Sequence, residues 1–188
     1  MPSPLRVLLI SGEYPPMQGG VADFTRLLGE AMVEQGADVH VLTSARARQA
    51  GDRGPVHCHP LMRSWRWGPL YGAVRALVGK IEPDIVNIQY QAAAYAMHPA
   101  INCLPLACRQ VPTVATFHDL LVPYLFPKAG RLRWWANLAL ARWSDAVIVT
   151  NPQDEARLKT YRWIRRLTLI PIGSNLACAP PAGYDRTE

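Results

Sequence analysis

Short apolar runs alternate with amphipathic segments along the chain, and this alternation predicts the secondary structure. Apolar residues recur at helical spacing in the amphipathic segments, whereas the runs between them have the length of strands. Strands are expected at Leu5–Ile10, Asp38–Thr43, Val56–Leu61, Asp84–Gln89, Pro112–Phe117, Ala146–Thr150 and Leu167–Ile172. Helices are expected at Val21–Gln35, Leu70–Ile81, within Pro99–Arg109, at Arg131–Trp143 and at Pro152–Tyr161.

Most of the expected strands are apolar at successive positions, which is typical of strands buried on both faces. Strands that alternate with helices in this way predict an α/β fold with a doubly wound, mainly parallel sheet and helices on both faces. The Arg-, Ala- and Gly-rich segment Ser44–Pro55 is expected to form an exposed loop, and Arg63–Pro69 an irregular, basic and aromatic stretch.

The first strand is followed by a glycine-containing loop that leads into a helix. The apolar run stops at Ser11 and Gly12, and Gly19 and Gly20 precede the first helical residue, Val21. A helix that begins there points backbone N–H groups and the positive end of its dipole into the loop, which suits anions and hydroxyl-rich ligands. Equally, a glycine pair in a turn often only relieves backbone strain. The loop lacks G-x-G-x-x-G, so a nicotinamide dinucleotide site is not predicted.

Polar residues follow several strands, and in a parallel sheet the strand carboxyl ends meet at one edge, where ligands bind. His118 is the main candidate for catalysis, because an imidazole there can bind a hydroxyl or phosphate oxygen or act as an acid or base. The alternative is a surface or capping histidine. Asp23 falls in the first helical turn and would repel a phosphate bound directly there. Further candidates for ligand binding at this edge are Glu13, Asp23, Asn87, Gln89, Tyr90, Asp119 and Asn151.

Composition narrows the class of protein. The chain has 188 residues, of which 49% are apolar and 18% charged, enough for the core of one domain. No apolar run is long enough to cross a membrane, and no signal peptide is recognisable at the start. The cysteines, at 58, 103, 108 and 178, form no C-x-x-C pair, so free thiols and a cytoplasmic location are expected. His57 and His59 would share one face of a strand, but no metal site is expected.

Arginine and tryptophan are interleaved in the second half of the chain, and the formal net charge is +6. Such residues suit an anionic membrane surface, so peripheral contact with the inner face of the plasma membrane is one hypothesis. The alternative is that the tryptophans belong to the core and the arginines to a solvated face. Nucleic acid is not expected as a partner, because no known binding module accompanies the charge. The residues concerned are Arg63, Trp65, Arg66, Trp67, Arg131, Arg133, Trp134, Trp135, Arg142, Trp143, Arg162, Trp163, Arg165 and Arg166.

Several motifs, in order along the chain, resemble the N-terminal domain of a family 4 (group 1) glycosyltransferase. They are Arg6-Val-Leu-Leu-Ile-Ser-Gly-Glu-Tyr-Pro-Pro, Gly19-Gly20-Val-Ala-Asp-Phe, Gly36-Ala-Asp-Val-His-Val-Leu-Thr, Pro83-Asp-Ile-Val-Asn-Ile-Gln, Thr116-Phe-His-Asp-Leu, Ala146-Val-Ile-Val-Thr-Asn and Leu169-Ile-Pro-Ile-Gly-Ser-Asn. The resemblance implies one half of a GT-B architecture, in which two Rossmann-like domains face each other across a cleft. It implies a hexosyltransferase that retains anomeric configuration, without a metal cofactor, and uses a UDP- or GDP-sugar donor and a glycan or lipid-linked acceptor.

By this resemblance Gly19 and Gly20 lie in the loop that faces the donor phosphates and the acceptor, and His118 lies near the transferred sugar. The other polar candidates at the strand ends would bind the acceptor. Residues 1–172 would form the acceptor-side domain, and 173–188, beginning with Gly173 as the hinge, the start of an interdomain linker. The donor domain would be missing, so the chain alone is expected to be inactive in building cell-envelope glycans. The exposed cleft face could then support a homodimer. The alternative function is a stand-alone module that binds a sugar nucleotide or a membrane without catalysis.

Overall fold

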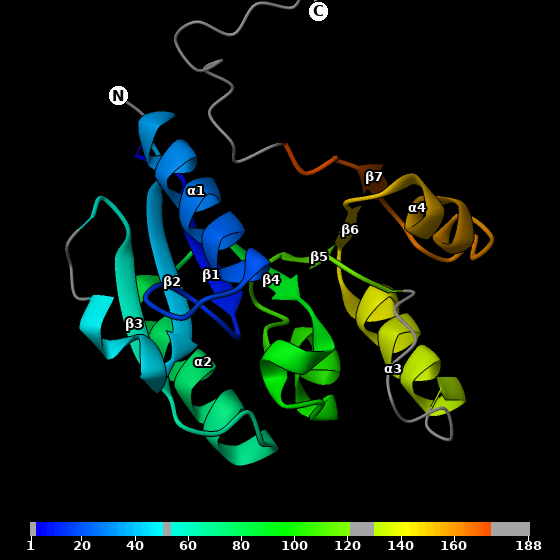
Figure 1. The fold of residues 1–188 in the computed structure, drawn as a ribbon, viewed down its shortest axis with the longest axis horizontal. Coiled ribbons are helices and arrows are strands. Elements are labelled where there is room, and N and C mark those ends of the chain that lie inside the picture. The colour runs from blue at the N-terminus through cyan, green and yellow to red at the C-terminus, as the bar shows by residue number, and fades with distance from the viewer. Residues whose placement is uncertain (1–2, 51–53, 121–129, 174–188) are drawn as a thin grey trace, which may run out of the picture.

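A computed structural model describes residues 3–50, 54–120 and 130–173 (Figure 1). Its strands are β1 (Arg6–Ser11), β2 (Asp38–Ser44), β3 (His57–Met62), β4 (Ile85–Tyr90), β5 (Thr113–Phe117), β6 (Ala146–Val149) and β7 (Leu167–Leu169). Its α-helices are α1 (Gly20–Glu34), α2 (Trp67–Ile81), α3 (Gly130–Trp143) and α4 (Pro152–Leu158). Its 3₁₀ helices are η1 (Ala45–Ala50), η2 (Ala92–Tyr95) and η3 (Pro99–Ala107).

All seven strands form one parallel sheet in the order β3-β2-β1-β4-β5-β6-β7. The chain first winds outward from β1 to β3 and then returns to β4 on the other side of β1, so the winding direction reverses between β1 and β4. The expected doubly wound α/β fold is therefore confirmed. The reversal places the carboxyl ends of β1, β4 and β5 side by side, where Ser11 pairs with Gln89 and Tyr90 with Phe117.

Two hydrophobic clusters bury the two faces of the sheet. On β1, Leu8 and Ile10 join the larger cluster, while Val7 and Leu9 join the smaller one. The smaller cluster includes residues from the end of α1, and the larger one includes the apolar faces of α2, η3, α3 and α4. Helices thus cover both faces, as the continuous apolar strands predict.

The main departures from the sequence-based prediction are at prolines and in short elements. The helix expected within Pro99–Arg109 is the 3₁₀ helix η3, which contains Pro105. A proline has no N–H to donate to the helix and cannot lie within a regular α-helix without distortion. The segment expected to be an exposed loop after β2 contains η1, whose Ala47 is buried, and α2 begins at Trp67, inside the stretch expected to be irregular. The last strand ends at Leu169 rather than at Ile172.

The tryptophans divide between the core and the surface, so the core alternative holds for only some of them, and membrane contact stays a prediction. Trp65 is buried, and Trp134 packs against the core, donates to the Tyr161 hydroxyl at 3.0 Å and lies 4.2 Å from the Arg157 guanidinium. The exposed tryptophans are Trp67, Trp135, Trp143 and Trp163. Among the described residues, no helix is long and apolar enough to cross a membrane.

Candidate active site

His118 directly follows β5 and lies at the edge of the sheet where the strand carboxyl ends meet. Its backbone N–H donates to the Tyr90 carbonyl at 3.1 Å, which extends the β4–β5 ladder by one residue. Its ring packs edge-on against Phe24 of α1, with the ring centroids 4.8 Å apart. The first helix and the fifth strand, far apart in the sequence, therefore meet at this histidine.

A chain of buried polar side chains runs from β4 to the His118 ring. Gln89 donates from Nε2 to Asn87 Oδ1 at 3.2 Å, and Thr116 donates to the same oxygen at 2.9 Å. The Gln89 amide must then point its oxygen at His118 Nε2, which lies 2.8 Å away. This order of donors and acceptors puts the ring proton on Nε2 and leaves the lone pair on Nδ1.

Burial lowers the pKa of His118 to about 4, because the charged imidazolium loses its solvation there. The ring is therefore neutral at physiological pH. A neutral imidazole whose Nε2–H group is hydrogen-bonded to Gln89 can accept a hydrogen bond from a ligand hydroxyl at Nδ1, or take up a proton there. Such a ring suits a sugar hydroxyl better than a phosphate, because a phosphate oxygen would need a donor.

The glycine loop leads into α1, the helix whose Phe24 contacts this histidine. Gly19 is the N-cap of α1 and makes no side-chain capping bond, so the first N–H groups of the helix receive no side-chain partner from the cap. The Thr25 hydroxyl lies 3.2 Å from the Ser11 hydroxyl, which donates to the Glu13 carbonyl at 2.6 Å, and these contacts tie α1 to the end of β1. A Cβ at Gly20 would meet nothing within 4 Å, whereas one at Gly19 would meet the Glu13 carboxylate.

The Glu13 carboxylate and the start of α1 therefore share one small region. The positive end of the helix dipole favours an anion at that position, and Glu13 supplies one from within the chain. A donor phosphate bound at the same helix start would have to displace this carboxylate. Asp23, in the first turn, is exposed.

The space between the ends of β1 and β4 is filled by η2. Tyr95 is fully buried, and its hydroxyl lies 2.8 Å from the Ile10 carbonyl and 2.9 Å from the Gln89 carbonyl. A Cβ at Gly12 would collide with the backbone of Ala94. The edge near β1 is thus closed by packing, whereas His118 lies two strands away, just after β5.

Other candidate residues are occupied elsewhere. The Tyr90 hydroxyl donates to Asn137 at 2.8 Å and accepts from Asn102 at 3.0 Å, in a buried network toward α3 and η3. Asn151 caps α4 by accepting from the Asp154 N–H at 2.8 Å. Asp119 is half-buried beside Asp154, whose pKa it helps to raise, although burial is the main cause. Gly173 is exposed, and a Cβ there would meet nothing within 4 Å.

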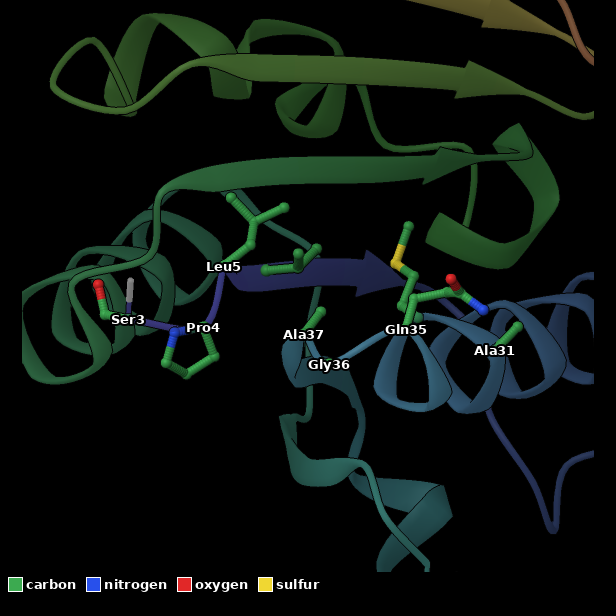
Figure 2. Close-up of a pocket in the computed structure, with 9 residues that line it drawn as sticks. Ser3, Pro4, Leu5, Ala31, Gln35, Gly36 and Ala37 are labelled. Atoms are coloured by element: carbon green, nitrogen blue, oxygen red, sulfur yellow. The ribbon is translucent and has the colours of Figure 1, made fainter. Parts of the chain in front are cut away.

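Sequence reasoning missed Phe24, Thr116 and Tyr95, which hold the site together. Phe24 fits the apolar stripe of its helix, so nothing in the sequence shows that its ring contacts His118. Thr116 precedes His118 by two residues and so shares its face of the strand, which is a signal that could have been used. The carboxyl edge of the sheet is separate from a cavity of about 570 Å³, which is lined by residues from the start of the chain and from the end of α1 (Figure 2).

Solved structures with the same fold include two glycosyltransferases. Sucrose-phosphate synthase from Thermosynechococcus elongatus is 23% identical, with a TM-score of 0.63, over 91% of this chain and 49% of its own. UGT2 from Phytolacca americana, solved with UDP-2fluoro-glucose and pterostilbene, is 9% identical, with a TM-score of 0.55, over 92% of this chain and 54% of its own. The Bordetella bronchiseptica enzyme WbmG, solved with NAD, is 17% identical, with a TM-score of 0.53, over 84% and 60%. No curated protein sequence matches the chain.

The fold and the comparisons together define a Rossmann-like domain of the kind found in GT-B glycosyltransferases. The chain spans about half the length of the sucrose-phosphate synthase that it matches. Residues 18–177 match the model of Glycosyltransferase Family 4, and the chain belongs to that family. The resemblance read from the motifs is thereby confirmed. Transfer of sugars is the activity that defines the family.

Proposed function

We propose that this chain is the acceptor-side half of a retaining glycosyltransferase that moves a hexose from a UDP- or GDP-sugar to a glycan or lipid-linked acceptor. Residues 1–172 form this half, and the segment from Gly173 onward leads toward a donor-binding domain. The observation that carries the proposal is the neutral, half-buried His118 ring at the carboxyl edge of the sheet, beside the start of α1. Membership of the family supports the class of reaction.

In this proposal His118 accepts a hydrogen bond from a hydroxyl of the sugar being transferred. Gln89 fixes the ring by accepting a hydrogen bond from its Nε2–H group, so Nδ1 is the atom that meets the substrate. A neutral group is well suited to this position, because it does not oppose the positive charge that develops on the sugar ring as the glycosidic bond breaks. The backbone N–H groups at Gly19 and Gly20 face the donor phosphates, and the Glu13 carboxylate moves aside when they bind.

The direct test is a transfer assay with radiolabelled UDP- and GDP-sugars, performed with the 188-residue chain and with the full product of its gene. The full product is expected to transfer label with one of the two nucleotide classes in the presence of EDTA. The 188-residue chain is expected to be inactive, since half of the groups that stabilise the transition state would be missing. Robust transfer by the 188-residue chain would refute the half-enzyme assignment. Failure of the full product with both nucleotide classes would refute the donor assignment.

A lipid-linked acceptor is favoured by one surface observation. Leu132 and Trp135, three residues apart on α3, are 76% and 67% exposed, and large apolar side chains on the same side of a helix suit the boundary of a bilayer. We therefore infer that α3 touches the cytoplasmic face of the plasma membrane. Sedimentation with anionic vesicles is expected to pellet the protein, and Trp135→Ala to weaken this more than Trp67→Ala on α2. Equal binding of both variants would contradict the assignment of this contact to α3.

A further inference from the structure

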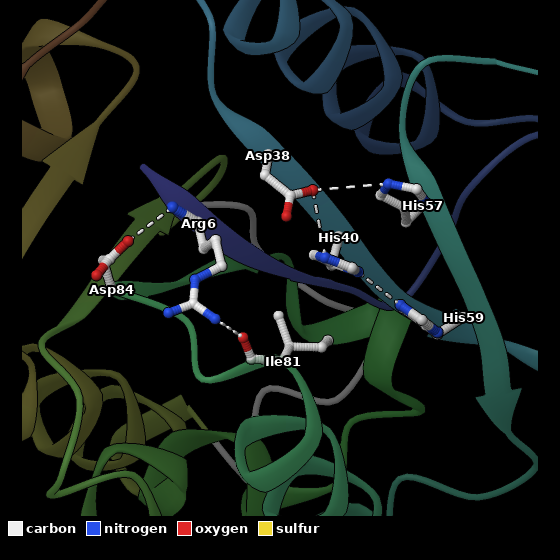
Figure 3. A network of polar contacts seen from close by, with 7 residues as sticks. All are labelled: Arg6, Asp38, His40, His57, His59, Ile81 and Asp84. Atoms are coloured by element: carbon white, nitrogen blue, oxygen red, sulfur yellow. Dashed lines mark hydrogen bonds and ion pairs between the residues drawn. The ribbon is translucent and has the colours of Figure 1, made fainter. Parts of the chain in front are cut away.

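Three histidines and one aspartate gather at the amino ends of β2 and β3, far from the carboxyl edge that holds His118 (Figure 3). Asp38 and His40 lie on the same face of β2, two residues apart, and His40 pairs in register with His57, the first residue of β3. Among Asp38, His40 and His57, the last is the most exposed, with 58% of its side chain accessible, against 34% for Asp38 and 15% for His40. No part of the proposed transferase mechanism uses them.

The two distances from the aspartate to the imidazoles are close to those between the ligands of a tetrahedral metal ion. Asp38 Oδ1 lies 3.4 Å from His40 Nε2 and 3.6 Å from His57 Nε2, and the three ligand atoms all lie within 4.8 Å of one another. Ligands bound to zinc at about 2.0–2.1 Å with tetrahedral angles lie about 3.3–3.4 Å apart. The aspartate therefore already stands at nearly the right separation from both imidazoles.

We propose that Asp38, His40 and His57 bind one divalent cation of the zinc class, with water as the fourth ligand. Two imidazoles and one carboxylate favour Zn²⁺, Co²⁺ or Ni²⁺ over Mg²⁺ and Ca²⁺, which prefer oxygen ligands. Binding requires one adjustment. The His40 and His57 rings are stacked, with their planes 24° apart, and two rings that coordinate one ion must turn their nitrogens toward a common point. The exposed His57 ring can make this rotation.

His59 supplies the outer contact that metal-binding histidines usually have. His40 Nδ1 lies 2.9 Å from His59 Nε2, on the side of the ring opposite the ligand nitrogen Nε2 (Figure 3). When His40 Nε2 binds the ion, its proton resides on Nδ1 and is donated to His59, which fixes the orientation of the ring.

The bound ion joins an edge strand to the rest of the sheet. β3 is the outermost strand on its side, and His57 begins it directly after the segment that leads from η1. With Asp38 and His40 on β2 and His57 on β3, the ion would clamp the first residue of the edge strand to its neighbour. Its expected effect is on stability, through preferential binding to the folded state, and not on sugar transfer.

The test is equilibrium dialysis of the full 188-residue chain against Zn²⁺ and Co²⁺, together with thermal unfolding at rising zinc concentration. One ion per chain is expected, with a midpoint that rises with zinc and with the intense visible bands of tetrahedral Co²⁺. Asp38→Asn and His57→Ala should each weaken binding by more than about 100-fold, and His59→Ala by about 10–100-fold, as for other outer partners of metal ligands. Circular dichroism without metal checks that each variant is folded.

Matched controls separate this site from other zinc-binding groups. Glu34→Gln changes an exposed carboxylate on α1, His98→Gln removes a histidine at the start of η3, and Cys58→Ser removes the thiol between the two histidines of β3. All three should bind zinc like the unchanged chain. Retention of stoichiometric binding by folded Asp38→Asn and His57→Ala, its loss in Cys58→Ser, or no binding of either metal by the unchanged chain would each overturn the proposal.

Discussion

The two ends of the parallel sheet hold histidines in opposite surroundings. At the carboxyl end, His118 is half-buried against Phe24, its ring nitrogen meets the neutral amide of Gln89, and burial is what lowers its pKa to about 4. At the amino end, His57 is exposed and His40 faces the carboxylate of Asp38. The same side chain is thus prepared for uncharged hydroxyl groups at one end and for a cation at the other.

The difference shows that partners, rather than residue type, decide what a histidine can bind. Burial lowers the pKa of His40 despite the neighbouring Asp38 carboxylate, and a neutral imidazole beside a carboxylate is the arrangement that binds a metal ion. At His118 the buried partner is an uncharged amide, which leaves the ring suited to an uncharged ligand. The carboxyl end also has the start of α1 on the same side of the sheet, whose N–H groups become donors for an anion once the Glu13 carboxylate moves aside. The donor sugar would therefore meet N–H groups at its phosphates and a neutral acceptor at its hydroxyl.

The largest expected effect is the loss of activity in His118→Ala, assayed in the full gene product. If the ring binds a hydroxyl of the transferred sugar, kcat/KM should fall about 100-fold, at the lower end of the range for groups that act in the transition state. His98→Gln, which changes a histidine outside both clusters, serves as the control and should retain activity. A His118→Ala enzyme with undiminished kcat/KM would remove His118 from the site.

The second expected effect is on stability as the pH falls. Folded His118 titrates at about 4, below the value of about 6.5 in the unfolded chain, so between these values only the unfolded state takes up the proton. Stability is therefore fully present above pH 6.5 and is lost as the pH falls toward 4, by about 3 kcal/mol from this residue. Urea unfolding of the unchanged chain and of His118→Asn at pH 7 and 4.5 measures the difference. Equal pH dependence in both would contradict burial as the cause.

The third expected effect tests how the carboxyl end is closed. A Cβ at Gly12 would collide with the backbone of Ala94, so Gly12→Ala must shift η2 and should cost about 1–3 kcal/mol of stability. Gly20→Ala is the matched control, because a Cβ there meets nothing within 4 Å and the change should stay within about 0.5 kcal/mol. Urea unfolding distinguishes them, and similar values for the two variants would show that η2 yields without cost.

Sequence patterns predicted most of the carboxyl end but little of the amino end. The doubly wound parallel sheet was predicted from the continuous apolar strands and the helices between them, and this prediction placed His118 and Gln89 at one edge. The reversal of the winding between β1 and β4 came from the structure. The role of Tyr90 could not be predicted, because the sequence pattern of a polar residue at a strand end is the same whether its hydroxyl faces solvent or the core. Here the Tyr90 hydroxyl donates to Asn137 in the core.

The cluster at the amino end required the register of two strands, which sequence alone does not give. His57 and His59 share a face of β3 by strand periodicity, but only pairing of His57 with His40 brings Asp38 within reach. The face of a strand on which a side chain lies can therefore be predicted from sequence, whereas contacts between neighbouring strands depend on how the strands pair.

The smallest expected effect at pH 7 comes from changing Gln89, the partner of His118. A glutamate there would place a carboxylate beside His118, as Asp38 lies beside His40 at the amino end. Gln89→Glu places a carboxylate 2.8 Å from His118 Nε2, and an opposite charge at this range raises a histidine pKa by about 1–3 units. The pKa of folded His118 would then lie at about 5–7, so the acidic limb of the kcat/KM profile should move to higher pH by the same amount, while activity at pH 7 falls about twofold or less.

Gln89→Leu is the matched control, because it removes the acceptor without adding charge, and it should lower kcat without moving the acidic limb to higher pH. A merely structural role for Gln89 would give two variants with the same pH profile. Because the buried glutamate could take the proton itself, ¹H–¹⁵N spectra of the His118 ring must show which group titrates, and a ring that still titrates near pH 4 would mean that the Gln89 oxygen does not face Nε2.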